Sequence, residues 1–252
     1  MNFCLIRILS DLYTGHNKHG DNVLIRFYNN HEKQNGVVRG SVLFFCVMVC
    51  FCHLSALNCY AFEGKVKSVI DGDTFILENN EKIRIASIDA PELEHDGKPE
   101  QYYAKEAREI LTKMILNKIV VIEAVDKKDH YGRTVGWVYL DNSFVNEQMI
   151  ANGAAFFYFH PNNDSSKQDF LLQTQRKAMS EMKGFWRKIF SLKDFNIKWV
   201  GNMRSRRCFR DGSNFSVTIM NRNKVRFSNL GDAFMQGYTP ARATMFWPSL
   251  TN

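Results

Sequence analysis

Acidic and arginine side chains recur at the ends of predicted strands in the middle of the chain, at Asp71, Asp73, Arg84, Asp89, Glu92 and Arg133. Asp73 begins one predicted strand and Asp89 closes the next, and a tight turn joins the two. Because such strands run antiparallel, the two carboxylates can lie at the same end of the pair, where they would bind a hard cation such as calcium. Aspartates are also common turn residues, so their spacing alone leaves a purely structural role open.

The arginines and the glutamate of this set suit chemistry on a phosphate group. Arg84 lies between two isoleucines of a predicted strand and therefore faces away from its buried side. Arg133 follows a Tyr-Gly turn, and guanidinium groups in such places can bind phosphate through two parallel hydrogen bonds. Glu92 follows a proline in a predicted loop, where its carboxylate could orient or deprotonate a water molecule. Taken singly, each could equally be an ordinary surface residue.

The strands that must position these side chains are short, β-prone and separated by turn residues. They are predicted at residues 64–70, 74–77, 82–88, 119–125 and 134–140. Apolar residues three and four positions apart predict helices at residues 99–116, 145–152 and 167–183. A three-stranded meander, a helix and then a hairpin predict an α+β fold built on an OB-type, five-stranded β-barrel with flanking helices.

Several of the residues fall into spaced motifs that follow one another along the chain. The motifs are Asp71-Gly72-Asp73-Thr74, the run from Arg84 to Glu92, Tyr131-Gly132-Arg133, Asn146-Glu147 and Gly184-Phe185-Trp186. In this order they resemble the thermonuclease (staphylococcal nuclease-like) family, and the resemblance covers residues 64–186. It implies an OB-fold barrel with flanking helices and calcium-dependent hydrolysis of phosphodiester bonds in DNA and RNA.

The resemblance also implies a role for each matching position. The calcium ligands would be the carboxylates of Asp73 and Asp89 and the backbone carbonyl of Ala90. Arg84 and Arg133 would bind the scissile phosphate, and Glu92 would act on the attacking water. The residues in contact with the nucleotide would be Tyr131, Phe157 and Phe159. The last two positions are often tyrosine in the family, so phenylalanine keeps stacking but removes hydroxyl hydrogen bonds.

Charge is unevenly distributed along the chain. Residues 62–187 contain 17 basic and 20 acidic side chains, a net charge of −3, whereas residues 188–252 contain 11 and 3, a net charge of +8. A basic segment can steer a polyanion, and arginines 204, 206, 207 and 210 near two aromatic residues could hold a nucleic-acid strand. One hairpin, around residues 221–223, is predicted there. The alternative is a loosely ordered basic extension without a role in binding.

The N-terminal part carries a candidate targeting signal. Residues 41–61 contain no formally charged side chain, follow Arg39 and end in small residues, as is typical of a secretory signal peptide cleaved after Ala61. The alternative is a retained membrane anchor, although the uninterrupted apolar part, residues 42–52, is short for a span of about 20 residues. Residues 1–40 are interpreted as an uncertain extension, either the product of an upstream start codon or a short cytoplasmic tail.

The sequence therefore predicts a secreted or periplasmic, calcium-dependent nuclease with its catalytic domain at residues 62–187 and a basic extension at 188–252. The substrate would be DNA and possibly RNA; no protein partner is implied, and a monomer is expected. A second hypothesis is an OB-fold module that binds nucleic acid without cutting it. A third is a membrane-anchored nuclease that retains residues 42–61.

Overall fold

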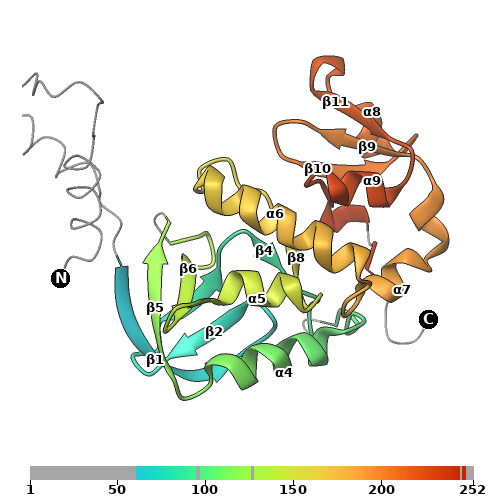
Figure 1. Cartoon of the computed structure of the whole chain (residues 1–252). Coiled ribbons are helices and arrows are strands. Elements are labelled where there is room, and N and C mark those ends of the chain that lie inside the picture. The colour runs from blue at the N-terminus through green and yellow to red at the C-terminus, as the bar shows by residue number, and fades with distance from the viewer. Residues whose placement is uncertain (1–60, 95–96, 126–127, 245, 248–252) are drawn as a thin grey trace, which may run out of the picture. The chain divides into compact units, whose positions relative to one another are not determined.

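The computed structural model describes residues 61–94, 97–125, 128–244 and 246–247 (Figure 1). The predicted extension at residues 1–40 and, apart from Ala61, the predicted leader or anchor at residues 41–61 lie outside this part of the chain. None of the described helices has the length and apolar character needed to cross a membrane.

A closed β-barrel forms the N-terminal half of the described chain. Its strands are β1 (Ala61–Val69), β2 (Thr74–Leu77), β3 (Lys82–Ile85), β5 (Ile119–Ala124), β6 (Thr134–Leu140) and the short β7 (Ser143–Phe144). They follow the order β3-β2-β1-β5-β6-β7, and a parallel pairing of β3 with β6 closes the sheet on itself. Closure leaves no free edge among the five main strands, which confirms the predicted α+β fold with an OB-type barrel.

The third strand is shorter than predicted, because the chain turns after Ile85. Ser87 has a φ of 53°, in the left-handed region that L-residues rarely adopt, so the prediction of one strand over residues 82–88 is wrong. Beyond the turn, β4 (Ile88–Asp89) pairs with β8 (Phe156–Phe157) outside the barrel sheet. The buried side chain of Asn146 fixes the turn by donating to the carbonyl of Ala86 at 2.7 Å.

Three helices cover the barrel, α4 (Ala104–Ile115), α5 (Val145–Ala151) and α6 (Ser165–Ser180) (Figure 1). The buried residues of α4 are Ala104, Ala107, Leu111 and Ile115, which confirms the predicted apolar face. This helix begins five residues later than predicted, because Tyr103 has a left-handed φ of 73°. The side chain of Asp164 caps α6 by accepting from the amide of Lys167.

The chain beyond the barrel folds into a second β-structure, here called the C-terminal module (residues 199–244). Its strands are β9 (Trp199–Asn202), β10 (Arg207–Arg210), β11 (Lys224–Phe227) and β12 (Thr239–Pro240), in the order β11-β9-β10-β12. Its helical segments are α8 (Asn214–Val217), η2 (Asn221–Asn223), α9 (Leu230–Met235) and η3 (Arg242–Thr244). The predicted hairpin is wrong, since residues 214–217 are helical and β11 pairs with β9.

The C-terminal module and the end of the barrel domain share one apolar core. Two short segments connect them, α7 (Trp186–Phe190) and η1 (Lys193–Asn196). The ring of Phe234 lies 5.0 Å from that of Trp186 and 5.8 Å from that of Phe156, measured between centroids. The side-chain amide of Gln175, on α6, donates to the carbonyl of Phe234 at 2.9 Å. The C-terminal module is therefore a packed structure and not a loosely ordered extension.

Candidate active site

Asp73 and its loop are held against the segment that follows β4. Gly72 approaches this segment so closely that a Cβ atom there would lie 2.6 Å from the Cβ of Ala90, so no larger residue fits without a shift. The amide of Ala90 donates to Asp73 Oδ2 at 2.8 Å, and the hydroxyl of Thr74 donates to Asp73 Oδ1 at 2.9 Å. Asp73 is thus a buried carboxylate that ties two loops together.

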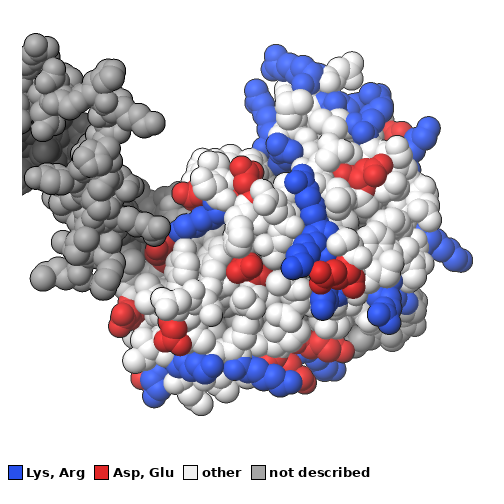
Figure 2. Space-filling model, in the orientation of Figure 1, with Lys and Arg blue, Asp and Glu red and all other residues white. Residues whose placement is uncertain are grey.

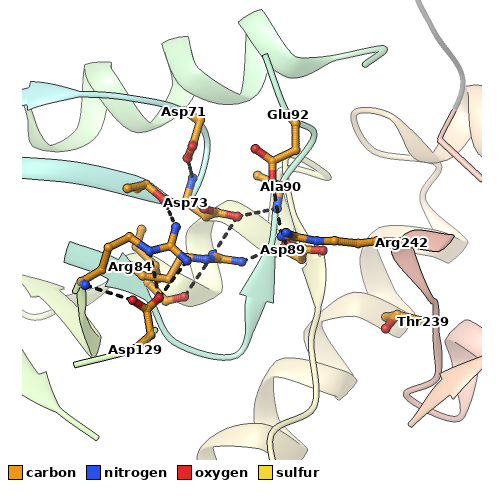
Figure 3. Close-up of polar contacts among 12 residues, drawn as sticks. Asp71, Asp73, Arg84, Asp89, Ala90, Glu92, Asp129, Thr239 and Arg242 are labelled. Atoms are coloured by element: carbon orange, nitrogen blue, oxygen red, sulfur yellow. Dashed lines mark hydrogen bonds and ion pairs between the residues drawn. The ribbon is translucent and has the colours of Figure 1, made fainter. Parts of the chain in front are cut away.

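Arg84 lies between the two aspartates that the sequence singles out (Figure 3). Its Nη1 is 2.7 Å from Asp73 Oδ2, and its Nη2 is 2.8 Å from Asp89 Oδ1. Burial lowers the pKa of Arg84, but the negative charges of Asp73 and Asp89 outweigh this effect and raise the pKa above its usual value. The guanidinium is therefore a fixed positive charge at the centre of the site.

Two further carboxylates face this centre, Asp71 and Glu92 (Figure 3). Burial and the nearby Asp73 carboxylate raise the pKa of Asp71 to about 8. Burial, with Asp73 and Asp89, also raises the pKa of Glu92. Gln101 makes two hydrogen bonds with the backbone of Glu92. Its side-chain oxygen accepts from the Glu92 amide at 2.9 Å, and its own backbone amide donates to the Glu92 carbonyl at 3.0 Å. Four acidic groups thus surround one arginine, so the site has an excess of negative charge.

Arg133 reaches the same centre through a hydroxyl group. Its Nη1 donates to Thr74 Oγ1 at 3.5 Å, and Thr74 in turn donates to Asp73. Its Nε and Nη2 both lie 2.9 Å from Asp129 Oδ2, a partner that the sequence analysis missed. Burial raises the pKa of Asp129, but hydrogen bonds from Arg133 outweigh it and hold the pKa below its usual value. Tyr131 is 64% exposed beside Arg133.

The donor set suits a hard cation. Oxygen ligands from carboxylates and backbone carbonyls are those that calcium prefers, and Asp73, Asp89 and the peptide of Ala90 lie together. In the described part of the chain, no cluster of three or more His, Cys, Asp or Glu side chains is arranged as a ready-made metal site. The excess of buried carboxylates nevertheless fits a divalent cation, because such a charge offsets their mutual repulsion.

The part of the chain that contains these residues is similar in sequence to known proteins. A family model described as staphylococcal nuclease homologue matches residues 82–188. The thermonuclease of Staphylococcus intermedius is 34% identical over 125 residues, covering 48% of this chain and 74% of that protein. The thermonuclease of Staphylococcus hyicus is 35% identical over 127 residues, with the same coverage. A probable endonuclease of Komagataella phaffii is 32% identical over 158 residues, covering 49% of this chain and 68% of that protein.

The chain belongs to the staphylococcal nuclease family. The resemblance predicted from the motifs is thereby confirmed, and with it a nuclease fold for the barrel. The family match ends at residue 188, so the C-terminal module, residues 199–244, lies beyond it. The roles of the individual site residues remain predictions, which the geometry supports to different degrees.

The two phenylalanines are placed differently from Tyr131 in this member of the staphylococcal nuclease family. Phe157 is 3% exposed and belongs to the barrel core, so its ring is not presented to a nucleotide. The ring of Phe159 is half-buried, and the guanidinium carbon of Arg206 lies 5.6 Å from its centroid. The structure therefore does not bring these two rings together with Tyr131 as an open stacking surface.

The C-terminal module adds two arginines that the sequence analysis did not place at the site. Arg242 Nη2 is 3.3 Å from Glu92 Oε1 and 3.5 Å from Asp89 Oδ1 (Figure 3). Arg207 lies over the ring of Tyr158, and its Nη2 donates to the carbonyl of Phe159 at 3.1 Å. No signal in the sequence points to Arg242, which is 150 residues from Glu92 and outside every motif.

Proposed function

We propose that this member of the staphylococcal nuclease family is a secreted or periplasmic, calcium-dependent enzyme that hydrolyses phosphodiester bonds of DNA and possibly RNA. The observation that carries the proposal is the position of Arg84, held within 2.8 Å of both Asp73 and Asp89. Glu92 faces this centre, and Arg133 is linked to it through Thr74. A cation site, a phosphate-binding arginine and a carboxylate base are thus within one small site.

Asp73, Asp89 and the carbonyl of Ala90 would hold the calcium ion. When bound there, calcium would polarise a phosphoryl oxygen and position a water molecule. The two guanidinium groups would bind the non-bridging phosphate oxygens and stabilise the charge that develops on them. Removing one such contact typically costs about 3–4 kcal/mol of transition-state stabilisation.

Glu92 would take the proton from the attacking water. The oxygen of this water forms a bond to phosphorus while the bond to the leaving nucleotide oxygen breaks. Burial raises the pKa of the Glu92 carboxyl, which brings its basicity closer to that needed to accept a proton near neutral pH. Its backbone hydrogen bonds with Gln101 hold it in place for this role.

Digestion of single-stranded DNA tests the proposal. The purified protein, its Glu92→Gln variant and a matched Glu94→Gln control would be compared in calcium and in a calcium chelator. Glu94 is exposed and only two residues away, so its loss should leave the rate unchanged. We expect cleavage that requires calcium and falls about 10²-fold or more in Glu92→Gln alone. Tight strand binding without cleavage would instead support the non-catalytic binding module.

Secretion depends on the predicted leader and needs its own measurement. Mass spectrometry of the mature N-terminus would show an end near residue 62 if the leader is cleaved after Ala61. Retention of residues 42–61 would support the membrane-anchored form.

A further inference from the structure

The C-terminal module is docked firmly beside the candidate active site. Its aromatic side chains share a core with Phe185 and Trp186, which are both fully buried. Arg207 also links the module to the barrel domain. Its Nη1 donates to Thr239 Oγ1 within the module at 2.6 Å, and its Nη2 donates to the carbonyl of Phe159. Because Phe159 lies two residues after β8, which pairs with β4, the module is held to the strand that carries Asp89.

The segment that carries Arg242 is fixed at both ends, while its side chain is open to solvent. The amide of Ala241 donates to the carbonyl of Cys208 at 3.0 Å, and the carbonyl of Thr244 accepts from Arg210 Nη1 at 2.7 Å. The Arg242 side chain is 67% exposed and points at Glu92 and Asp89 (Figure 3). The backbone is therefore fixed, and the guanidinium is accessible to a ligand that approaches the site.

The present partners of Arg242 do not hold it tightly. Its contacts to Asp89 and Glu92 are 3.5 and 3.3 Å long, and each is made by the same nitrogen, Nη2. The guanidinium of Arg242 is 67% exposed, so water screens both contacts from its side, whereas the side chains of Asp89 and Glu92 are only 13% and 32% exposed. A phosphate oxygen can therefore approach the guanidinium of Arg242 from the solvent side.

The charge distribution favours binding of a polyanionic substrate by the C-terminal module. Residues 62–187 have a net charge of −3, and four carboxylates face the reaction centre, whereas residues 188–252 have a net charge of +8. Figure 2 shows Lys and Arg side chains gathered over the C-terminal module, at the top of the view. Arg133, the other arginine proposed to bind phosphate, is paired with Asp129. The net positive charge that would attract a polyanion therefore lies in residues 188–252, which include the C-terminal module.

We propose that Arg242 binds a backbone phosphate of the nucleic-acid substrate, so that the C-terminal module forms a second wall of the substrate site. The inference rests on the proposed nuclease function and deepens it, because it assigns a substrate-binding residue outside the family match. The planar guanidinium group of an arginine can bind two oxygens of one phosphate. Arg242 lies beside the proposed position of the scissile phosphate, where such binding would hold the substrate backbone. Its contacts with Asp89 and Glu92 show that the guanidinium already points at the site without substrate.

Binding of a fluorescein-labelled single-stranded oligonucleotide tests the inference without relying on catalysis. Anisotropy would be measured over a salt series, in a calcium chelator, for the wild type, Arg242→Gln and a matched Arg226→Gln control. Arg226 is an exposed residue of β11 in the same module, so the control removes the same charge elsewhere. Loss of one phosphate contact on a single strand should lower the slope of log Kd against log salt by about 0.7. We expect this change and about tenfold weaker binding only in Arg242→Gln.

Kinetics in calcium provide a second readout. Arg242→Gln should raise KM about tenfold and lower kcat by less than about threefold, and Arg242→Lys should restore the salt slope but only part of the affinity. If the salt slope and KM of Arg242→Gln are unchanged, the inference is overturned, whether or not the variant binds calcium more tightly. Arg242 would then be only a counter-ion of Asp89 and Glu92. A wild type that does not cleave in calcium would overturn the proposed function, while the binding slopes would still decide the role of Arg242.

Discussion

The carboxyl group of Asp71 has a strongly raised pKa. Burial and the neighbouring Asp73 raise its pKa from 3.8 to about 8, although its Oδ1 accepts a hydrogen bond from the Asp73 amide. Asp71 is a carboxylate like Asp73 and Asp89, the proposed calcium ligands. Among the hydrogen bonds and ion pairs of the described residues, however, it lacks the contact with Arg84 that those two make. Without a bound cation, its ionisation therefore opposes folding.

The pH dependence of stability follows from this pKa. Between pH 3.8 and about 8, the folded chain binds the Asp71 proton more tightly than the unfolded chain does, so stability falls as pH rises through this window. Asp71→Asn removes the titration and keeps a side-chain acceptor for the Asp73 amide. In chelator at pH 8, we expect the variant to be more stable than the wild type by at least about 1 kcal/mol, since one pKa unit corresponds to about 1.4 kcal/mol.

Urea denaturation at several pH values checks this expectation. The difference between variant and wild type should be small at pH 4 and should grow toward pH 8. Asp141→Asn, at an exposed turn position with a φ of 52°, is the matched control and should show no such trend. A difference that does not vary with pH would show that Asp71 is not the titrating group.

At the level of helices and strands, the sequence predicts those elements whose bounds depend on neighbouring residues alone. The strand at residues 134–140 was predicted with its observed bounds, because β-prone residues between turn signals determine it. The sequence also predicts that Asp73 and Asp89 converge, but from one continuous strand over residues 82–88, whereas in the structure Asp89 lies on β4 and both carboxylates contact Arg84. The break after Ile85 was not predicted, because the turn there depends on Asn146, which is 60 residues from Ala86. Burial of Phe157 likewise depends on a distant pairing, that of β8 with β4.

Asn146 is therefore expected to stabilise the turn that leads to the site. Its Nδ2 donates to the Ala86 carbonyl, and its Oδ1 accepts from the Val138 amide at 3.0 Å. Asn146→Ala leaves two buried backbone groups without these partners, which should destabilise the fold by about 2–4 kcal/mol. Asn152→Ala, at the exposed end of the same helix, removes only a bond to the Gln148 carbonyl and should cost less than about 1 kcal/mol.

Urea denaturation of both variants measures the difference. A loss of activity in Asn146→Ala at temperatures where it remains folded would further show that the turn positions Asp89. Equal stability of the two variants would mean that water or a shifted backbone replaces the bonds of Asn146.

At the scale of the whole molecule, the C-terminal module could not be predicted from its own residues. Its strands are two to four residues long, which is too short for a clear alternation of apolar and polar side chains. Its apolar core is completed by aromatic residues of the barrel domain, among them Phe185 and Trp186. For the same reason Arg242 was not foreseen, because only this packing brings it to Glu92.

A shared core predicts that the barrel and the C-terminal module unfold together. Phe234 is fully buried and contacts Phe156, Trp186 and Phe246 by its ring. Phe234→Ala should therefore destabilise the protein by about 3–5 kcal/mol and leave a single transition at a lower temperature. Phe215→Ala is the matched control, because this ring is 52% exposed on the same module, and it should cost less than about 1 kcal/mol. Two separate transitions in Phe234→Ala, with the barrel melting as in the wild type, would show that the module is an independent unit.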